Sequence, residues 1–153
     1  MAVDFAWLEQ RILGRSLSDR EKGLLGIMIT ELHLPAGQAV CIEPGNGGTL
    51  YLLRSGEAEV LLEWGDECLR VPSISEGAQL GDLASLLDES ACATLIARDD
   101  CVAYRIRRRA FDALLASRQP LACDMVYGVL SCTASAIREL QMRRAGQVPG
   151  KRI

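Results

Sequence analysis

The residues best placed to do chemistry lie in one stretch near the middle of the chain, residues 80–95. Gly81 and Asp82 are followed by apolar residues at the spacing of a single helical turn, and small strand-forming residues close the stretch. The first turn of a helix leaves free backbone N–H groups, and these groups together with the helix dipole attract an anion. One Gly-Asp pair is a weak motif, since an ordinary helix N-cap has the same residues. The stretch therefore predicts either an anion-binding turn or a plain helix start.

Other kinds of chemistry lack the residues that they need. The chain contains one histidine, His33, whereas a metal-dependent jelly-roll enzyme of the cupin type needs two or three histidines and a carboxylate. His33 is also the only base available to a cysteine nucleophile, and we expect it to be structural. We therefore predict no enzymatic activity and no metal site.

The cysteines are predicted to be reduced thiols in the core. No two of them form a C-x-x-C pair, and most have apolar sequence neighbours, where a thiol behaves as a small hydrophobe. Disulfides and an iron–sulfur cluster are disfavoured for the same reason. The six positions are Cys41, Cys68, Cys92, Cys101, Cys123 and Cys132.

Length and composition fit one compact domain. The chain has 153 residues, of which 49% are hydrophobic and 24% charged, so it can bury a core. Its net charge of -3 gives no general attraction to nucleic acid or to an anionic membrane. No apolar run approaches the roughly 20 residues of a membrane span, and the N-terminus lacks the features of a signal peptide. We expect a cytoplasmic protein without membrane contact.

Hydrophobic spacing divides the chain into helices, then strands, then helices. Apolar residues recur at helical spacing over 4–30, and Ser18 and Glu21 form a capping box for a second helix. From Leu32 the period changes to two, and glycine-bounded short strands of this kind are typical of a sandwich, jelly roll or barrel. From Arg107 the helical period returns. The predicted segments are an N-terminal helical segment 1–31, a β-roll 32–106, C-terminal helices 107–142 and a flexible tail 143–153.

A narrow apolar seam runs along the predicted long helix 121–142. Small residues near it, including Gly128, suit close helix–helix contact. The seam can pack back on the roll or pair with a second copy of the chain, and we favour a homodimer. Its residues are Leu121, Met125, Val129, Cys132, Ala136 and Leu140.

The order of these elements over residues 15–140 resembles the cyclic nucleotide-binding domain family. In this sequence 34–40 looks like the first roll strand and 44–60 like the family's glycine-bounded strand pair; 80–95 falls on the phosphate-binding cassette. The resemblance implies an α+β fold: a double-stranded β-helix, or jelly-roll-like β-roll, flanked by N-terminal helices and by a short and a long C-terminal helix. It also implies ligand contacts at Gly81, Asp82, Leu83, Ala84, Ala91, Cys92 and Thr94.

The cassette departs from the family pattern at two points. The family's Phe-Gly-Glu, whose glutamate accepts from the ribose hydroxyl, is Leu80-Gly81-Asp82 here, with an acid one methylene shorter. The family's Pro-Arg is Ser90-Ala91 here, so the phosphate-binding arginine is replaced by alanine. Losing a bidentate arginine–phosphate contact weakens binding by on the order of a hundredfold. We therefore expect weakened binding of cAMP or cGMP. A different small anion is the other candidate ligand.

One single arginine and one cluster of arginines are possible sources of positive charge. Arg98 could replace the missing cation, but Arg98-Asp99-Asp100 is typical of a hairpin turn with a solvated side chain. Arg105, Arg107, Arg108 and Arg109 could suggest nucleic acid, but such a cluster at a strand-to-helix junction is usually a solvated face. Only about a dozen residues follow Leu140, too few for a helix-turn-helix motif. We expect no direct nucleic-acid binding.

The sequence thus predicts a non-catalytic, stand-alone regulatory domain. Ligand in the 80–95 turn would reposition the 107–140 helices, which would carry the signal to an unidentified protein effector. The alternative is a ligand-free scaffold or interaction module that has kept the fold and lost nucleotide binding.

Overall fold

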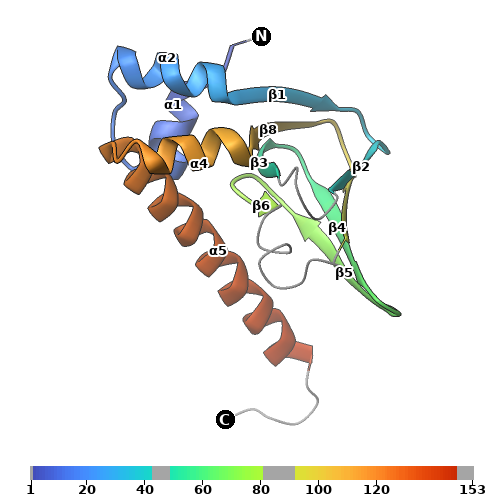
Figure 1. Ribbon diagram of the computed structural model, residues 1–153. Helices are drawn as coiled ribbons and strands as arrows, with labels where there is room; N and C mark the ends of the chain where they lie inside the picture. Colours follow the sequence, from blue (N-terminus) through green and yellow to red (C-terminus); the bar gives the residue numbers. More distant parts are fainter. Residues whose placement is uncertain (1, 43–48, 81–91, 148–153) are drawn as a thin grey trace.

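A computed structural model describes residues 2–42, 49–80 and 92–147 of the chain. Helices gather at one side of the molecule and strands at the other, with the long helix α5 running away from the other helices toward the C-terminus (Figure 1). The described helical elements are α1 (Phe5–Leu8), the π-helical turn η1 (Glu9–Leu13), α2 (Asp19–Met28), α4 (Arg108–Ala116) and α5 (Pro120–Gln147).

The strands form the two sheets of a β-roll, which confirms the predicted fold class. The first sheet has the order β1-β8-β3-β6 and the second the order β2-β7-β4-β5, with antiparallel pairing throughout. Strand 1 pairs with 8, 2 with 7, 3 with 6 and 4 with 5, which is the pairing of a jelly roll. The strands are β1 (Ile29–Leu34), β2 (Ala39–Ile42), β3 (Thr49–Ser55), β4 (Ala58–Trp64), β5 (Glu67–Ile74), β6 (Gln79–Leu80), β7 (Cys92–Ala97) and β8 (Cys101–Arg107).

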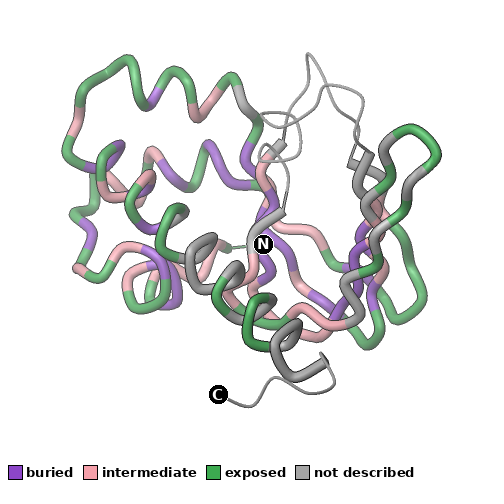
Figure 2. The backbone as a smooth tube through the Cα atoms, turned by 90° about the horizontal axis from the view of Figure 1, so that it is seen from below, coloured by how far each residue is buried: buried purple, intermediate pink, exposed green. Residues whose placement is uncertain are grey.

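Two hydrophobic cores lie on opposite faces of the first sheet, because successive side chains of a strand point to opposite faces. The helix-side core lies between this sheet and the helices, and the roll core lies between the two sheets; the buried backbone is concentrated in these regions (Figure 2). The helix-side core includes Trp7, Leu8, Ile12, Leu25, Leu52, Tyr104, Ile106, Leu121 and Met125. The roll core includes Leu34, Tyr51, Leu53, Ala58, Val60, Leu95, Ala97, Cys101 and Ala103.

Three predicted boundaries differ from the structure. The first strand begins at Ile29, before the change of period at Leu32. The stretch 34–40 is not one strand, since Gln38 N–H donates to the Pro35 carbonyl and Gly37 has φ 87°, which makes a turn between β1 and β2. Helix α5 extends to Gln147, beyond the predicted end at 142, because no proline interrupts the helix there and a single glycine lowers helix stability only by about 1 kcal/mol.

The first part of the α5 seam is used within the chain. Leu121 and Met125 are fully buried in the helix-side core, so these two residues are not a dimer interface, contrary to the prediction. For Val129, Cys132, Ala136 and Leu140 the structure describes the helical backbone but not the side chains.

Gly128 sets the distance between α5 and the N-terminal helices. A Cβ atom at this position would lie 2.2 Å from the Ile12 carbonyl oxygen and 2.8 Å from Ile12 Cγ2. The predicted close helix–helix contact at Gly128 is therefore confirmed, and its partner is η1 of the same chain.

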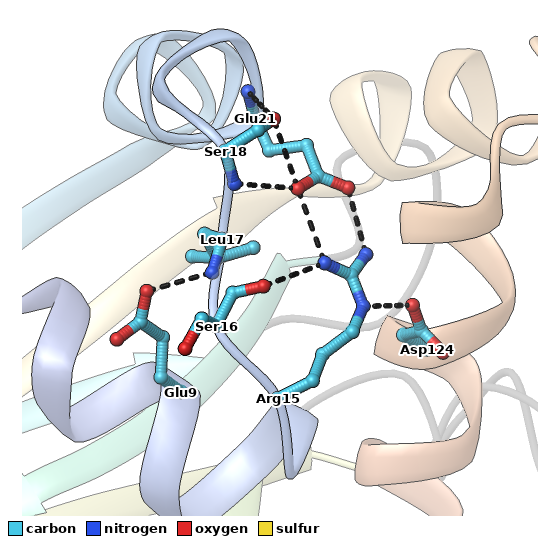
Figure 3. Close-up of polar contacts among 7 residues, drawn as sticks. All are labelled: Glu9, Arg15, Ser16, Leu17, Ser18, Glu21 and Asp124. Atoms are coloured by element: carbon cyan, nitrogen blue, oxygen red, sulfur yellow. Dashed lines mark hydrogen bonds and ion pairs between the residues drawn. The ribbon is translucent and has the colours of Figure 1, made fainter.

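An arginine clamp ties α5 to the start of α2 (Figure 3). Arg15 Nε donates to Asp124 on α5 at 2.7 Å, and Arg15 Nη2 donates to Glu21 at 2.7 Å. Glu21 also completes the predicted capping box, since its carboxylate accepts from Ser18 N–H at 2.8 Å while Ser18 Oγ accepts from Glu21 N–H at 3.3 Å. The clamp fixes the beginning of α5 against the N-terminal segment.

The close approach at Gly128 predicts a large effect of one added methyl group. Gly128→Ala should destabilise the fold by about 1–3 kcal/mol, because the Ile12 backbone must move. Gly23→Ala is the matched control in the exposed part of α2, where an added Cβ meets nothing within 4 Å, and it should stabilise by about 0.5–1 kcal/mol through helix propensity. Urea unfolding curves of both variants measure the difference, and equal effects would contradict this account of α5 packing.

The clamp also predicts an acid-dependent loss of stability. Hydrogen bonds from Arg15 and from the Ser18 backbone lower the pKa of Glu21 from 4.5 to about 2. A carboxyl with a lower pKa in the folded chain contributes stability above its unfolded pKa and loses it as the pH falls from about 4.5 to about 2. Glu21→Gln should lower stability by about 1 kcal/mol at pH 7, and the difference from the parent chain should shrink on acidification. Thermal melts between pH 2 and 7 test this, and a constant difference would rule it out.

Candidate functional site

The predicted ligand-binding stretch begins and ends on described strands. Leu80, the last residue of β6, pairs with Tyr51 in the first sheet, and Cys92, the first residue of β7, pairs with Glu63 in the second sheet. The stretch therefore connects the two sheets of the roll. The predicted contact residues Gly81, Asp82, Leu83, Ala84 and Ala91 lie outside the described residues, and of Cys92 only the backbone is described.

Thr94 does not face the interior of the roll, contrary to the prediction. It lies in β7 directly before Leu95, which is buried in the roll core. Because side chains alternate along a strand, Thr94 projects from the outer face of the second sheet, in register with Leu61 and Cys41. Its hydroxyl is therefore not a ligand contact inside the roll.

Arg98 is held on the same outer face and does not enter the roll. Its Nη2 atom donates to Glu59 at 3.2 Å, and Arg70 donates to the same carboxylate at 2.7 Å. Glu59 lies between Ala58 and Val60, which face the roll core, so its own side chain points outward. Arg98 lies in a bend between β7 and β8, but these strands belong to different sheets, so the predicted hairpin is wrong. The side chain of Arg98 is 44% exposed, as predicted, and is also paired with Glu59.

Arg105, unlike Arg98, lies on a strand face that is directed toward the interior of the roll. It lies in β8, two residues after Ala103 of the roll core, and it pairs directly with Tyr51, which is also in that core. Its side chain is partly buried, and its Nε atom is buried without a hydrogen-bond partner among the described residues. The interpretation of Arg105 as part of a solvated arginine cluster is therefore wrong, whereas Arg107 and Arg109 are exposed.

The sequence contained a signal for this inward arginine. Along β8 the large apolar residues Val102, Tyr104 and Ile106 alternate with Cys101, Ala103 and Arg105, so Arg105 is in phase with the small buried residues. Cross-strand neighbours share a face, which places Thr30, Arg105, Tyr51 and Leu80 in one row across the inner face of the first sheet. This row ends at the strand from which the predicted ligand-binding stretch departs.

Contacts near this row attach the N-terminal helices to the roll. Trp7 Nε1 donates to Glu76, which lies in the turn between β5 and β6, and Arg11 forms an ion pair with Glu76 at 3.5 Å. Asp4 is the N-cap of α1, and its carboxylate pairs with Arg54 on β3. The Trp7 amide and Arg54 together hold the pKa of Asp4 below its usual range. The turn that leads into β6 is thus bonded to a helix.

A second surface feature lies on the helices α4 and α5. An apolar groove of about 440 Å³ opens between them, lined by Leu115, Cys123, Val126, Tyr127 and Leu130 among others. Tyr127 is 74% exposed and Leu130 is 59% exposed. This face of α5 differs from the seam that carries Leu121 and Met125.

Histidine and cysteine chemistry receives no support from the described geometry. His33 is exposed, with its Nε2 atom 2.7 Å from Glu31. Among the described residues, no cluster of three His, Cys, Asp or Glu side chains could hold a metal ion. Cys101 is a buried free thiol as predicted, whereas Cys68 and Cys123 are exposed, contrary to the prediction of core thiols. In the same part of the chain, none of the helices combines the length and apolar content needed to cross a bilayer.

Comparison with known sequences gives a family match that covers the roll and α4. The sequence profile of the cyclic nucleotide-binding domain matches residues 31–118. A cAMP-dependent protein kinase regulatory subunit from Emericella nidulans is 33% identical over 110 residues, which are 72% of this chain and 26% of that protein. The chain therefore spans about a quarter of the length of this relative.

Solved structures show the same fold. A cyclic nucleotide-binding domain from Methylobacillus flagellatus aligns over 97% of this chain and 84% of its own, with a TM-score of 0.72 at 20% identity. The regulatory domain of protein kinase A from Toxoplasma gondii, solved with cAMP, aligns over 71% of this chain and 41% of its own, with a TM-score of 0.52 at 26% identity. With its β-roll, its flanking helices and the profile match over more than half of its length, the chain belongs to the cyclic nucleotide-binding domain family.

Proposed function

We propose that this chain is a regulatory domain that binds a cyclic nucleotide inside its β-roll and transmits the binding event through its helices to a protein effector. The observation that carries the proposal is the profile match over residues 31–118, which runs from within β1 through β8 to the end of α4. The similar fungal protein is named a cAMP-dependent kinase regulatory subunit, so cAMP is the first ligand to test, with cGMP as the second. In this proposal the domain is cytoplasmic and non-catalytic, and it acts on another protein rather than on nucleic acid.

Contacts at β6 support the path from ligand to helices. Helix α5 contacts β6, and both α1 and η1 are bonded to Glu76 in the turn before β6 through Trp7 and Arg11. A ligand that moves the segment following β6 would therefore shift elements in direct contact with the helices. Such a ligand changes the helix positions only by its difference in affinity for the two arrangements.

The alternative proposal is a ligand-free interaction module. It is supported by Ala91, which replaces the arginine that the family resemblance assigns to the cyclic phosphate. In that case the roll would serve only to hold α4 and α5 in place. The two proposals differ in one measurable property, the binding of a cyclic nucleotide.

Calorimetric titration separates the two proposals. Saturable binding of cAMP or cGMP to the parent chain is expected for a sensor. Ala91→Arg should tighten that binding by on the order of a hundredfold, because it adds charge-assisted hydrogen bonds to phosphate. Ala113→Arg, at an exposed position of α4, is the control for a general effect of added charge. Silent titrations for both the parent chain and Ala91→Arg would reject the sensor proposal in favour of the scaffold.

We further propose that the chain forms a homodimer through the exposed face of α5. The sequence predicts a homodimer on the seam that carries Leu121 and Met125, whereas this proposal places it on the exposed face that carries Tyr127. The exposed stripe on this face of α5 consists of Cys123, Tyr127 and Leu130. These residues follow each other at spacings of four and three, which is the repeat that pairs two long helices. A second copy presents the same stripe, so a two-fold axis beside α5 would bury both.

Light scattering after size-exclusion chromatography tests the dimer. The parent chain should elute with the mass of two chains, and Leu130→Glu should elute with the mass of one, since it would place a charge in the apolar interface. Ile27→Glu is the matched control, because Ile27 is 87% exposed on α2 and away from this face, and it should remain dimeric. A monomeric parent chain or a dimeric Leu130→Glu variant would refute the proposed interface.

A further inference from the structure

Arg105 differs from the other arginines that contact the roll. Arg54 pairs with Asp4, and Arg70 and Arg98 share Glu59. These charges lie at the surface with a carboxylate partner. Arg105 instead extends from the inner face of the first sheet, where its Nε atom is buried and has no hydrogen-bond partner among the described residues.

A buried guanidinium nitrogen without an acceptor is unfavourable, since it has lost water and gained nothing in return. Groups of this kind are expected at functional or strained sites. On this face Tyr51 and Thr30 lie beside Arg105, Ala103 and Leu53 form the row on one side, and the exposed Arg107 with Thr49 forms the row on the other. None of these neighbours offers a carboxylate, so within the described part of the chain the buried Nε atom of Arg105 has no counter-charge beside it.

The position of Arg105 matches the place where ligand charge is expected. Arg105, Tyr51 and Leu80 are register partners on β8, β3 and β6, so Arg105 and Leu80 are about 10 Å apart, twice the ~4.8 Å spacing of neighbouring strands. Leu80 is the last described residue before the stretch that the family resemblance assigns to phosphate. Register therefore places Arg105 in the same row as Leu80, and an arginine side chain is long enough to bridge most of this spacing.

We propose that Arg105 is the cation of the ligand site and binds the phosphodiester of a cyclic nucleotide, in place of the arginine that Ala91 has replaced. This inference rests on the proposed function of the roll. The fork of guanidinium donors suits a phosphate oxygen pair, and the apolar surroundings strengthen the attraction between the two charges. The positive charge that pairs with the phosphate is thus supplied by strand β8 rather than by the stretch after β6.

A substitution separates this role from a structural one. Arg105→Met keeps much of the side-chain length and removes the charge. Cyclic nucleotide affinity should fall about ten- to a hundredfold, the effect of one or two charge-assisted hydrogen bonds, while the ligand-free chain should unfold at the same temperature as the parent or higher. Arg70→Met is the control, because Arg70 is 61% exposed and pairs with Glu59 on the outer face; its affinity should not change. A lower unfolding temperature for Arg105→Met with unchanged affinity would overturn the proposal.

Nuclear magnetic resonance of the unmodified chain gives an independent test. The Nε–H signal of Arg105, assigned as the signal that Arg105→Lys lacks, should shift saturably on titration with cAMP or cGMP. If only inorganic phosphate shifts it, the cation site stands and the cyclic nucleotide function fails. If a nucleotide binds without shifting it, the function stands and the role of Arg105 is refuted. If neither nucleotide nor phosphate moves the signal, the role of Arg105 is refuted whether or not the chain binds nucleotide.

Discussion

The alternation of side chains along β8 is the constraint on which the rest of the molecule depends. Val102, Tyr104 and Ile106 face the helices, while Ala103 and Arg105 face the interior of the roll. Because β8 pairs with β1 on one side and β3 on the other, a slip of one residue would exchange these two faces along the whole strand. One strand thus forms a shared wall between the core that holds the helices and the core that holds the proposed ligand site.

This shared wall gives the ligand site a mechanical connection to the helices. The Tyr104 hydroxyl accepts from the Asp4 backbone, and its ring packs edge-on against Trp7 with centroids 5.7 Å apart. Trp7 in turn reaches Glu76, in the turn before β6. The N-terminal helices are therefore bonded both to the wall and to the turn, and the Arg15 clamp and the Gly128 contact join α5 to the same unit. The helices are thus linked to one another and to the roll at several points.

Charge is distributed unevenly over this scaffold. On the outer surface, carboxylates and guanidinium groups pair within short distances, as Glu59 does with Arg70 and Arg98. Glu59 itself is buried, whereas Arg70 and Arg98 are 61% and 44% exposed, so water screens these pairs from the arginine side. Inside the roll the core is apolar, so the buried Nε atom of Arg105 lies where water screens a charge less than it does around the exposed arginines. A site for an anion can therefore depend on one residue.

The sequence by itself determined the local features of this protein. The capping box at Ser18 and Glu21 and the change from helical spacing to alternation at Leu32, three residues after the first strand begins, depend on residues only a few positions apart. For that reason the order of helices and strands could be predicted, and with it the family. The ligand-binding role of the stretch after β6 was predicted only through the resemblance to that family.

Only the tertiary structure decided which face of each element is used. Helix α5 carries two apolar stripes, one through Met125 and one through Tyr127, and helical spacing alone cannot rank them; packing against Ile12 buries the first and leaves the second exposed. In the same way, Thr94 faces outward and Arg105 inward because of the strands they pair with. Contacts between residues far apart in the chain decide which side of a helix or strand is buried. The spacing of residues along the chain does not contain those contacts.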